Sequence, residues 1–183
     1  ARDPESHLAR ELLAQVEINT HQFEVALSIC EEILHKDKES LTALAIRSDA
    51  LYELGRNREA FETADLLVEL KPNLASYTRA AFFQWLRGDS DAAIRSSKLA
   101  IEASNDPSKP EPRAYALVQA ANFFFHAGDY DGADEGYKQA AKLLSDYPPA
   151  LVGRGRVAMT KQEPKRAVEF FSVAFKQAAH ADT

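Results

Sequence analysis

Histidine and cysteine are the side chains here with the widest chemical reach, as metal ligands, proton carriers or nucleophiles. Because the histidines are scattered, none is expected to share a metal-binding helix spacing with a second His or with a Glu on the same face. The positions are His7, His21, His35, His126 and His180. No metal site is therefore predicted.

Cys30 is the single cysteine of the chain, which excludes an internal disulfide framework and a site built from several cysteines. No basic helix start or histidine lies beside it in the sequence. Cys30 is therefore expected to be a small apolar residue on a buried helix face rather than a reactive thiol.

Other catalytic patterns are missing as well. No glycine-rich phosphate loop follows a strand pattern, and no nucleophile motif surrounds the Ser, His and Asp residues. Asp129 and Asp131 are interpreted as turn and helix-cap residues rather than as a catalytic pair of acids. The sequence therefore predicts a protein that is not an enzyme and that needs no cofactor.

The amino-acid composition makes some kinds of binding partner less plausible than others. The 183 residues are 45% apolar and carry a net charge of −6, which disfavours nucleic acid, because phosphate backbones require clustered Lys and Arg. The charge changes along the chain, from −9 over residues 1–147 to +3 over residues 148–183. No apolar run approaches the roughly 20 residues that span a bilayer. The cytoplasm is favoured, and an exported compartment is left open.

The elements that position these residues follow from an internal repeat. The segment Gly128-Asp129-Tyr130-Asp131-Gly132-Ala133 recurs in weaker form four times. The alanines that close the five copies are separated by 34, 33, 40 and 34 residues, which is typical of a helical repeat array. They are Ala26, Ala60, Ala93, Ala133 and Ala167.

Each copy is expected to form two antiparallel helices, because apolar residues recur at helical spacing on both sides of the turn. We expect a leader at 1–6 and an array over 7–183, with repeats at about 7–40, 41–73, 74–107, 114–147 and 148–181. Three prolines between Ser104 and Pro112 predict a stiff insertion, 104–112, before a helix that starts near Pro112.

With these markers in register, the chain resembles the tetratricopeptide repeat (TPR) family along nearly its whole length. The fourth repeat matches best, with Leu117, Ala121, Gly128, Asp129, Tyr130, Ala133, Tyr137 and Ala140. The resemblance implies an all-α, right-handed superhelix of about five helix-turn-helix units. The closing alanines, together with Ala14, Ser48, Ala81, Ala121 and Gly155, are expected to be the points where paired helices approach closely.

The resemblance also implies that first helices line a concave groove that binds a peptide or protein segment. The candidate groove residues are Asp49, Tyr52, Arg79, Phe82, Trp85, Gln119, Asn122, Phe125, His126 and Arg156. Two interpretations of the rings stay open, packing between repeats and contact with a ligand. The Lys and Asn clamp that some family members use for a terminal carboxylate is largely missing, with leucines at positions 8 and 12.

Two functions follow from this pattern. The first is a protein-interaction scaffold without catalysis of its own. The alternative is a regulatory or substrate-presenting segment of a larger multidomain enzyme or assembly factor. Phe170, Phe171, Val173 and Phe175 on the last helix form an apolar face, so we expect either a chain that continues past Thr183 or self-association through this helix.

Overall fold

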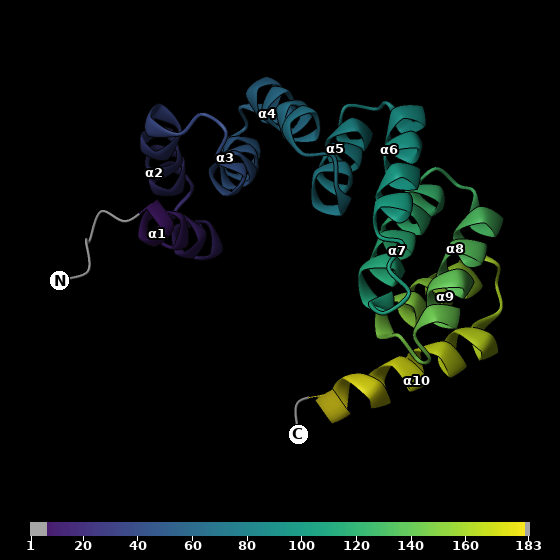
Figure 1. Ribbon diagram of the computed structural model, residues 1–183. Coiled ribbons are helices and arrows are strands. Elements are labelled where there is room, and N and C mark those ends of the chain that lie inside the picture. Colours follow the sequence, from purple (N-terminus) through teal and green to yellow (C-terminus); the bar gives the residue numbers. More distant parts are fainter. Residues whose placement is uncertain (1–6, 182–183) are drawn as a thin grey trace. The chain divides into compact units, whose positions relative to one another are not determined.

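The computed structural model describes the backbone of residues 7–181 and the side chains of residues 7–177. Within that part, the regular elements are ten α-helices in chain order (Figure 1). The chain divides into two compact units between Pro72 and Asn73, and each unit is described by itself. The expected leader, residues 1–6, lies outside the described residues.

The first unit holds two repeats. Its helices are α1 (His7–Asn19), α2 (Phe23–Lys36), α3 (Leu41–Glu53) and α4 (Asn57–Leu70). Each helix packs against the next, and α1 also contacts α3. The small residues Ala14 and Ala26 let α1 and α2 approach closely over a core of aliphatic side chains. That core consists of Ala14, Ala26, Cys30, Ile33, Ala43 and Ile46.

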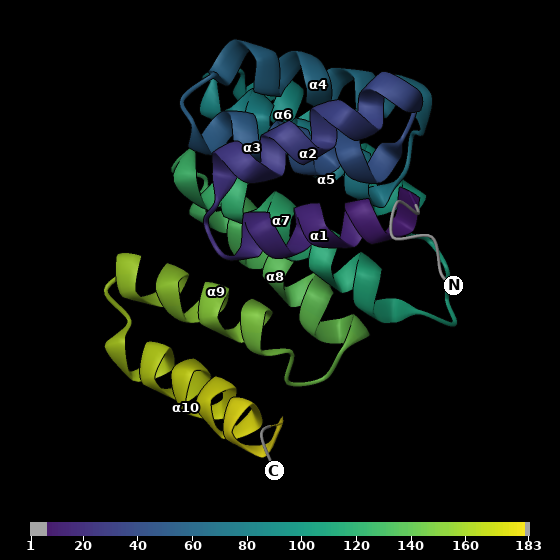
Figure 2. The same cartoon turned by 90° about the vertical axis from the view of Figure 1, so that its left-hand side faces the viewer.

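The second unit holds three repeats. Its helices are α5 (Leu74–Leu86), α6 (Ser90–Ala103), α7 (Pro110–His126), α8 (Tyr130–Leu143), α9 (Pro148–Thr160) and α10 (Pro164–Ala181). The first helices contact one another, α5 with α7 and α7 with α9, and each second helix packs on its own first helix. Figure 2 shows the last such pair, α9 and α10, side by side. The main core joins α7, α8 and α9 around the buried ring of Tyr137.

The turn between the two helices of a repeat has the same backbone conformation five times. In the fourth repeat, Gly128 has a φ of 84°, in the left-handed region where a residue without Cβ is not strained. The equivalent residues of the other four turns also have positive φ, although two are not glycine. They are His21, Gly55, Gly88 and Gln162. The repeat is therefore present in the backbone even where the sequence motif is weak.

The small residues lie where close helix contact was expected. All five closing alanines have no exposed surface, and Ala14, Ser48, Ala81, Ala121 and Gly155 are buried as well. A Cβ at Gly155 would lie 2.4 Å from Cε1 of Phe171 on α10, so these two helices tolerate no larger residue there without movement. The packing interpretation of the repeat code is confirmed.

Asp129 begins α8 as predicted. Its carboxylate accepts a 2.9 Å hydrogen bond from the backbone N–H of Gly132, one of the free amides of the first turn. Asp131 instead pairs with Lys161 at the start of the next turn. Asp129 therefore caps the helix as interpreted, whereas Asp131 makes an ion pair instead of a cap.

One boundary differs from the prediction. The structure begins α7 at Pro110, two residues before the expected start at Pro112. The physical reason is that the first-turn amides of a helix have no partner within the helix, so Pro110 and Pro112 cost no hydrogen bond there. The prolines of this segment therefore start a helix as well as ending the loop.

Candidate functional site

The predicted groove residues all lie on first helices, and the two units share them unequally. Asp49 and Tyr52 belong to α3 of the first unit, where both are half-buried. The other eight belong to the second unit. They are Arg79, Phe82 and Trp85 on α5, Gln119, Asn122, Phe125 and His126 on α7, and Arg156 on α9.

Within the second unit, four of these rings and one guanidinium form a continuous row. Phe82 lies 6.5 Å from Trp85 between ring centroids, and Trp85 lies 5.3 Å from His126 on the next first helix. His126 meets Phe125 edge to face at 5.8 Å. We call Phe82, Trp85, His126, Phe125 and Arg156 the ring row. These separations fall in the range where aromatic pairs attract one another.

Arg156 ends the row. Its guanidinium carbon lies 4.3 Å from the centroid of the Phe125 ring, close enough for a cation–π contact. Tyr130 at the start of α8 also packs against Phe125, with ring centroids 5.4 Å apart in a T-shaped arrangement. Phe125 thus contacts a cation from the next repeat and a ring from its own repeat.

The ring row is neither core nor free surface. Phe82 is 40% exposed and His126 is exposed, whereas Trp85, Phe125 and Arg156 are half-buried. Trp85 also packs against Phe123, a buried residue of α7, with ring centroids 6.0 Å apart. Packing between repeats therefore holds one side of the rings, and the other side faces solvent. The packing interpretation therefore accounts for one side of these rings, and contact with a ligand stays a prediction for the other.

Asn122 has a structural partner. Its side-chain oxygen accepts a 2.7 Å hydrogen bond from the hydroxyl of Tyr137, which is fully buried. Burial raises the pKa of Tyr137, and the nearby charge of Arg156 opposes this only partly. Asn122 therefore connects α7 to α8, and its carbonyl is already engaged.

Two members of this neighbourhood, Phe123 and Tyr130, are not among the residues that the sequence predicted. The repeat pattern gives Phe123 no groove position, and it explains Tyr130 as part of the turn motif alone. For Phe123 the signal is its spacing, since it lies three residues before His126 on the same helix, whereas Tyr130 begins the next helix and no helical spacing relates it to His126.

The first helices of the second unit are cationic, although the whole chain has a net charge of −6. Helices α5, α7 and α9 carry four arginines, and their only acid is Glu111 in the first turn of α7. Arg79 and Arg156 lie at the predicted groove positions, and Arg113 and Arg154 make other contacts. Two of the four arginines, Arg79 and Arg156, therefore lie with the rings.

The histidine prediction needs a correction at two places, because Glu31 lies four residues before His35 on α2 and Glu11 four residues after His7 on α1. Nε2 of His7 lies 3.1 Å from Oε1 of Glu11, one turn further along α1, and 3.8 Å from Oδ2 of Asp37. A spacing of four residues places His7 and Glu11 on the same helix face, which the prediction denied for every histidine. Among the described residues, no three His, Cys, Asp or Glu side chains are placed to hold a metal ion. The side chain of His180 lies outside the described residues.

Five helix pairs joined by one repeated turn, with small residues at each close contact, define the tetratricopeptide repeat fold, an all-α solenoid. No protein-family model matches the sequence, and no curated protein matches it. Solved structures do match the fold of the chain. PilW, a type IV pilus biogenesis factor, superposes with a TM-score of 0.80 at 18% identity over 96% of this chain and 79% of that one.

Two further matching structures are of TPR proteins. TTC0263, a TPR protein of Thermus thermophilus, matches with a TM-score of 0.75 at 20% identity, over 95% of this chain and 92% of its own. YrrB, a TPR protein with an unusual peptide-binding site, matches with a TM-score of 0.62 at 15% identity, over 95% and 87%. At these identities the likeness concerns the fold alone. Within residues 7–181, no helix has the length and apolar character needed to cross a bilayer.

Proposed function

We propose that this chain is a protein-interaction module that binds an extended, acidic segment of a protein partner along the first helices α5, α7 and α9 of its second unit. The observation that carries the proposal is the ring row, in which partly exposed aromatic rings lie on helices rich in arginine and poor in acids. Flat rings supply contact area to apolar side chains, and arginines supply paired hydrogen bonds to carboxylates. YrrB, with its peptide-binding site, has the same fold.

The side chains of the ring row and their neighbours favour one kind of peptide ligand. An extended peptide exposes backbone N–H and C=O groups that need partners, and Gln119 is a half-buried amide on the same stripe of α7 as His126. The cations at Arg79 and Arg156 favour carboxylates on the ligand rather than lysines. We therefore expect a segment that combines one or two large apolar residues with Asp or Glu.

Trp85 offers a direct test, because it is the only tryptophan of the chain and lies in the ring row. A displayed peptide library is selected against the full chain, and the binders are titrated while the fluorescence of Trp85 is recorded. Selected peptides should be acidic and should change this fluorescence. Phe82→Ala and Arg156→Ala should each weaken binding by about tenfold or more.

A matched control is Arg95→Ala, which removes an exposed arginine from the second helix α6. It should leave the affinity unchanged. Binders that respond equally to Arg95→Ala and Arg156→Ala, or that leave Trp85 unaffected, would contradict the assignment of the site. Lysine-rich binders would contradict the assignment of the ligand.

A second proposal concerns self-association through α10. Val168 is 63% exposed and Phe175 is 76% exposed, two turns apart on one helix, which is more apolar surface than one helix usually presents to water. We propose that a second copy covers this face. Sedimentation should show a concentration-dependent dimer that Phe175→Asp abolishes. A monomer at all concentrations would remove the proposal, and the alternative of a larger multidomain enzyme would then be tested from the parent gene.

A further inference from the structure

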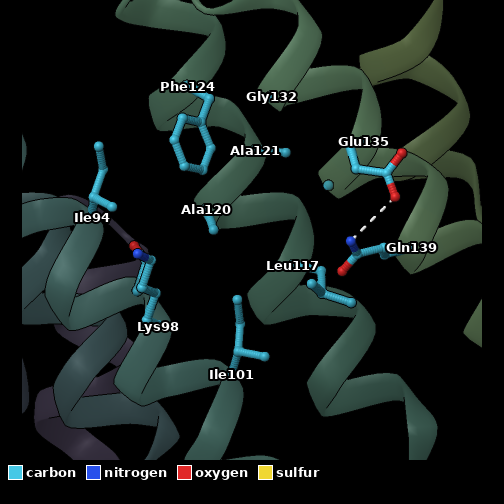
Figure 3. A pocket seen from close by; sticks show the side chains of 12 residues that line it. Ile94, Lys98, Ile101, Leu117, Ala120, Ala121, Phe124, Gly132, Glu135 and Gln139 are labelled. Carbon is cyan, nitrogen blue, oxygen red and sulfur yellow. Dashed lines mark hydrogen bonds between the residues drawn. The ribbon is translucent and has the colours of Figure 1, made fainter.

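A hollow of about 250 Å³ opens between the second helices α6 and α8. The floor is α7, and α6 and α8 stand on either side without any Cα atoms within 8 Å of each other. Figure 3 shows Ile94, Lys98 and Ile101 on the α6 side, and Glu135 with Gln139 on the α8 side. We call this space the α6–α8 hollow.

The α6–α8 hollow is separate from the ring row. Leu117, Ala121 and Phe124 line its floor and follow one stripe of α7. With about 3.6 residues per turn, Gln119 and His126 lie on the opposite stripe of the same helix. The hollow and His126 therefore lie on opposite sides of α7, and Phe125 of the ring row lies between these two stripes.

Other repeats fill the equivalent space with their own side chains. The filling residue is the one that precedes the buried small residue of the first helix, namely Arg47 before Ser48 and Arg154 before Gly155. Arg47 reaches across to α4, where it hydrogen-bonds Thr63 and lies 3.8 Å from Glu59. The gap is thus closed by an arginine in the first unit.

The last gap, between α8 and α10, is closed in the same way. Nε of Arg154 lies 3.0 Å from Oδ1 of Asp134 on α8, and its guanidinium carbon lies 4.3 Å from the ring centroid of Phe170 on α10. The space left there is about 20 Å³. Burial alone would raise the pKa of Asp134, but hydrogen bonds from Lys138 and Arg154 outweigh it and lower that pKa.

The α6–α8 hollow stays open because the filling side chains are missing. Ala120 precedes Ala121 where the second and fifth repeats have arginine, as Ala80 precedes Ala81 in the third repeat, and Gly136 follows Ala133 by three residues where Phe170 follows Ala167. Gly136 cannot be enlarged easily, since a Cβ there would lie 2.9 Å from Cβ of Ala121. The close approach of α8 to α7 therefore leaves position 136 without a side chain that could fill the hollow.

The walls decide the chemistry of that group. Ile94, Ile101, Leu117 and Phe124 are apolar, and no carboxylate lies inside to pair with a guanidinium as Asp134 does. The charges stand at the rim, with Lys98 exposed on α6 and Glu135 exposed on α8, where it accepts a 3.2 Å hydrogen bond from Gln139. The volume is below the roughly 300–1,000 Å³ typical of small-molecule pockets and suits one large side chain.

We propose that the α6–α8 hollow is a second docking site, which receives one large apolar side chain, Leu, Met or Phe, from an amphipathic helix of a protein partner. The partner helix lies along the gap between α6 and α8 and takes the place of a contact that these two helices do not make. Its acidic residues face Lys98 and its basic residues face Glu135, which sets its direction. This site goes beyond the proposed function, which uses the other side of α7.

The test is a selection of displayed amphipathic helical peptides against the full chain, with counter-selection against Ala120→Arg. This substitution places in the hollow the residue that two other repeats already carry, and circular dichroism and thermal unfolding check that the fold is kept. Selected peptides should share one large apolar position. Changing it to Ala, or using Ala120→Arg, should weaken binding about tenfold or more.

Three further variants separate the possible outcomes. Lys98→Glu changes an exposed rim residue and should shift the preference of the peptides from acidic to basic residues on that side. Phe82→Ala and Arg156→Ala should leave these peptides unaffected, which separates this site from the ring row. A selection that yields no peptide whose binding is weakened by Ala120→Arg overturns the proposal. Tight binding of the fatty acid decanoate that Ala120→Arg abolishes, with no such peptide found, would also overturn it.

Discussion

The hydroxyl of Tyr137 on α8 donates a 2.7 Å hydrogen bond to the side-chain oxygen of Asn122 on α7. The Tyr137 ring has no exposed surface and lies in the core that joins α7, α8 and α9. This single residue therefore ties one repeat together and also packs against the next.

Removing the hydroxyl tests the polar part of this arrangement. Tyr137→Phe keeps the ring and should lower the free energy of unfolding by roughly 1 kcal/mol, because Asn122 is only half-buried and water can replace its lost donor. Urea denaturation measures the change. Tyr115→Phe, at a residue that is 43% exposed, is the control and should stay within about 0.5 kcal/mol of the wild type. Equal effects at both positions would contradict a structural role for the bond.

Gly153 tests the packing of the same ring. A Cβ at Gly153 would lie 2.3 Å from Cε1 of Tyr137, which has no room to move. Alanine usually stabilises a helix interior by up to about 1 kcal/mol relative to glycine, but overpacking costs about 1–3 kcal/mol and should win here. Gly153→Ala should therefore destabilise the second unit in thermal unfolding.

Gly155→Ala is the matched comparison on the same helix. Its Cβ would lie 2.4 Å from the Phe171 ring, but that ring is 37% exposed and can turn toward solvent. The loss should be smaller than for Gly153→Ala, and the gain in helix propensity should offset part of it. A larger loss at Gly155 would show that the burial of the ring does not decide the cost.

The parts of the fold that depend on local patterns could be predicted from the sequence. The repeat spacing predicts close contacts at Ala133 and Ala121, and the turn motif predicts the position of Gly128. Gln162 has a positive φ although it is not glycine, so only its position in the repeat predicts a turn there. The contact between Trp85 and His126 joins residues on different helices, and ring orientation across a helix interface depends on packing that no local pattern encodes. The open hollow at Ala120 becomes visible only by comparison with the geometry of Arg154.

The turn at Gly128 gives a backbone prediction. With a φ of 84°, Gly128→Ala should lower the free energy of unfolding by about 1 kcal/mol or more, although nothing lies within 4 Å of the added Cβ. Gly128→Asn should cost less, because asparagine tolerates the left-handed region. Equal losses for Ala and Asn in chemical denaturation would indicate a cause other than backbone strain.

Cys30 gives a prediction about chemical reactivity and pH. It has no exposed surface, and burial raises the pKa of its thiol from 9.0 to about 12, although the charge of Arg47 opposes the rise. A pKa of about 12 in place of 9.0 lowers the thiolate fraction at pH 8 roughly a thousandfold. Native protein should therefore react with a disulfide reagent very slowly at pH 8, and fully once it is unfolded in denaturant.

The pH dependence of stability follows from the same pKa. Below pH 9 the thiol is protonated in both the folded and the unfolded chain, so its burial costs nothing extra. Above pH 9 the unfolded chain loses the proton and the folded chain keeps it, so the free energy of unfolding should fall as the pH rises from 9.0 toward about 12. Cys30→Ala removes the titrating group and should flatten this part of the curve. A slope that persists in Cys30→Ala would assign it to other groups, and rapid labelling of the native protein would show that the first unit opens around α2.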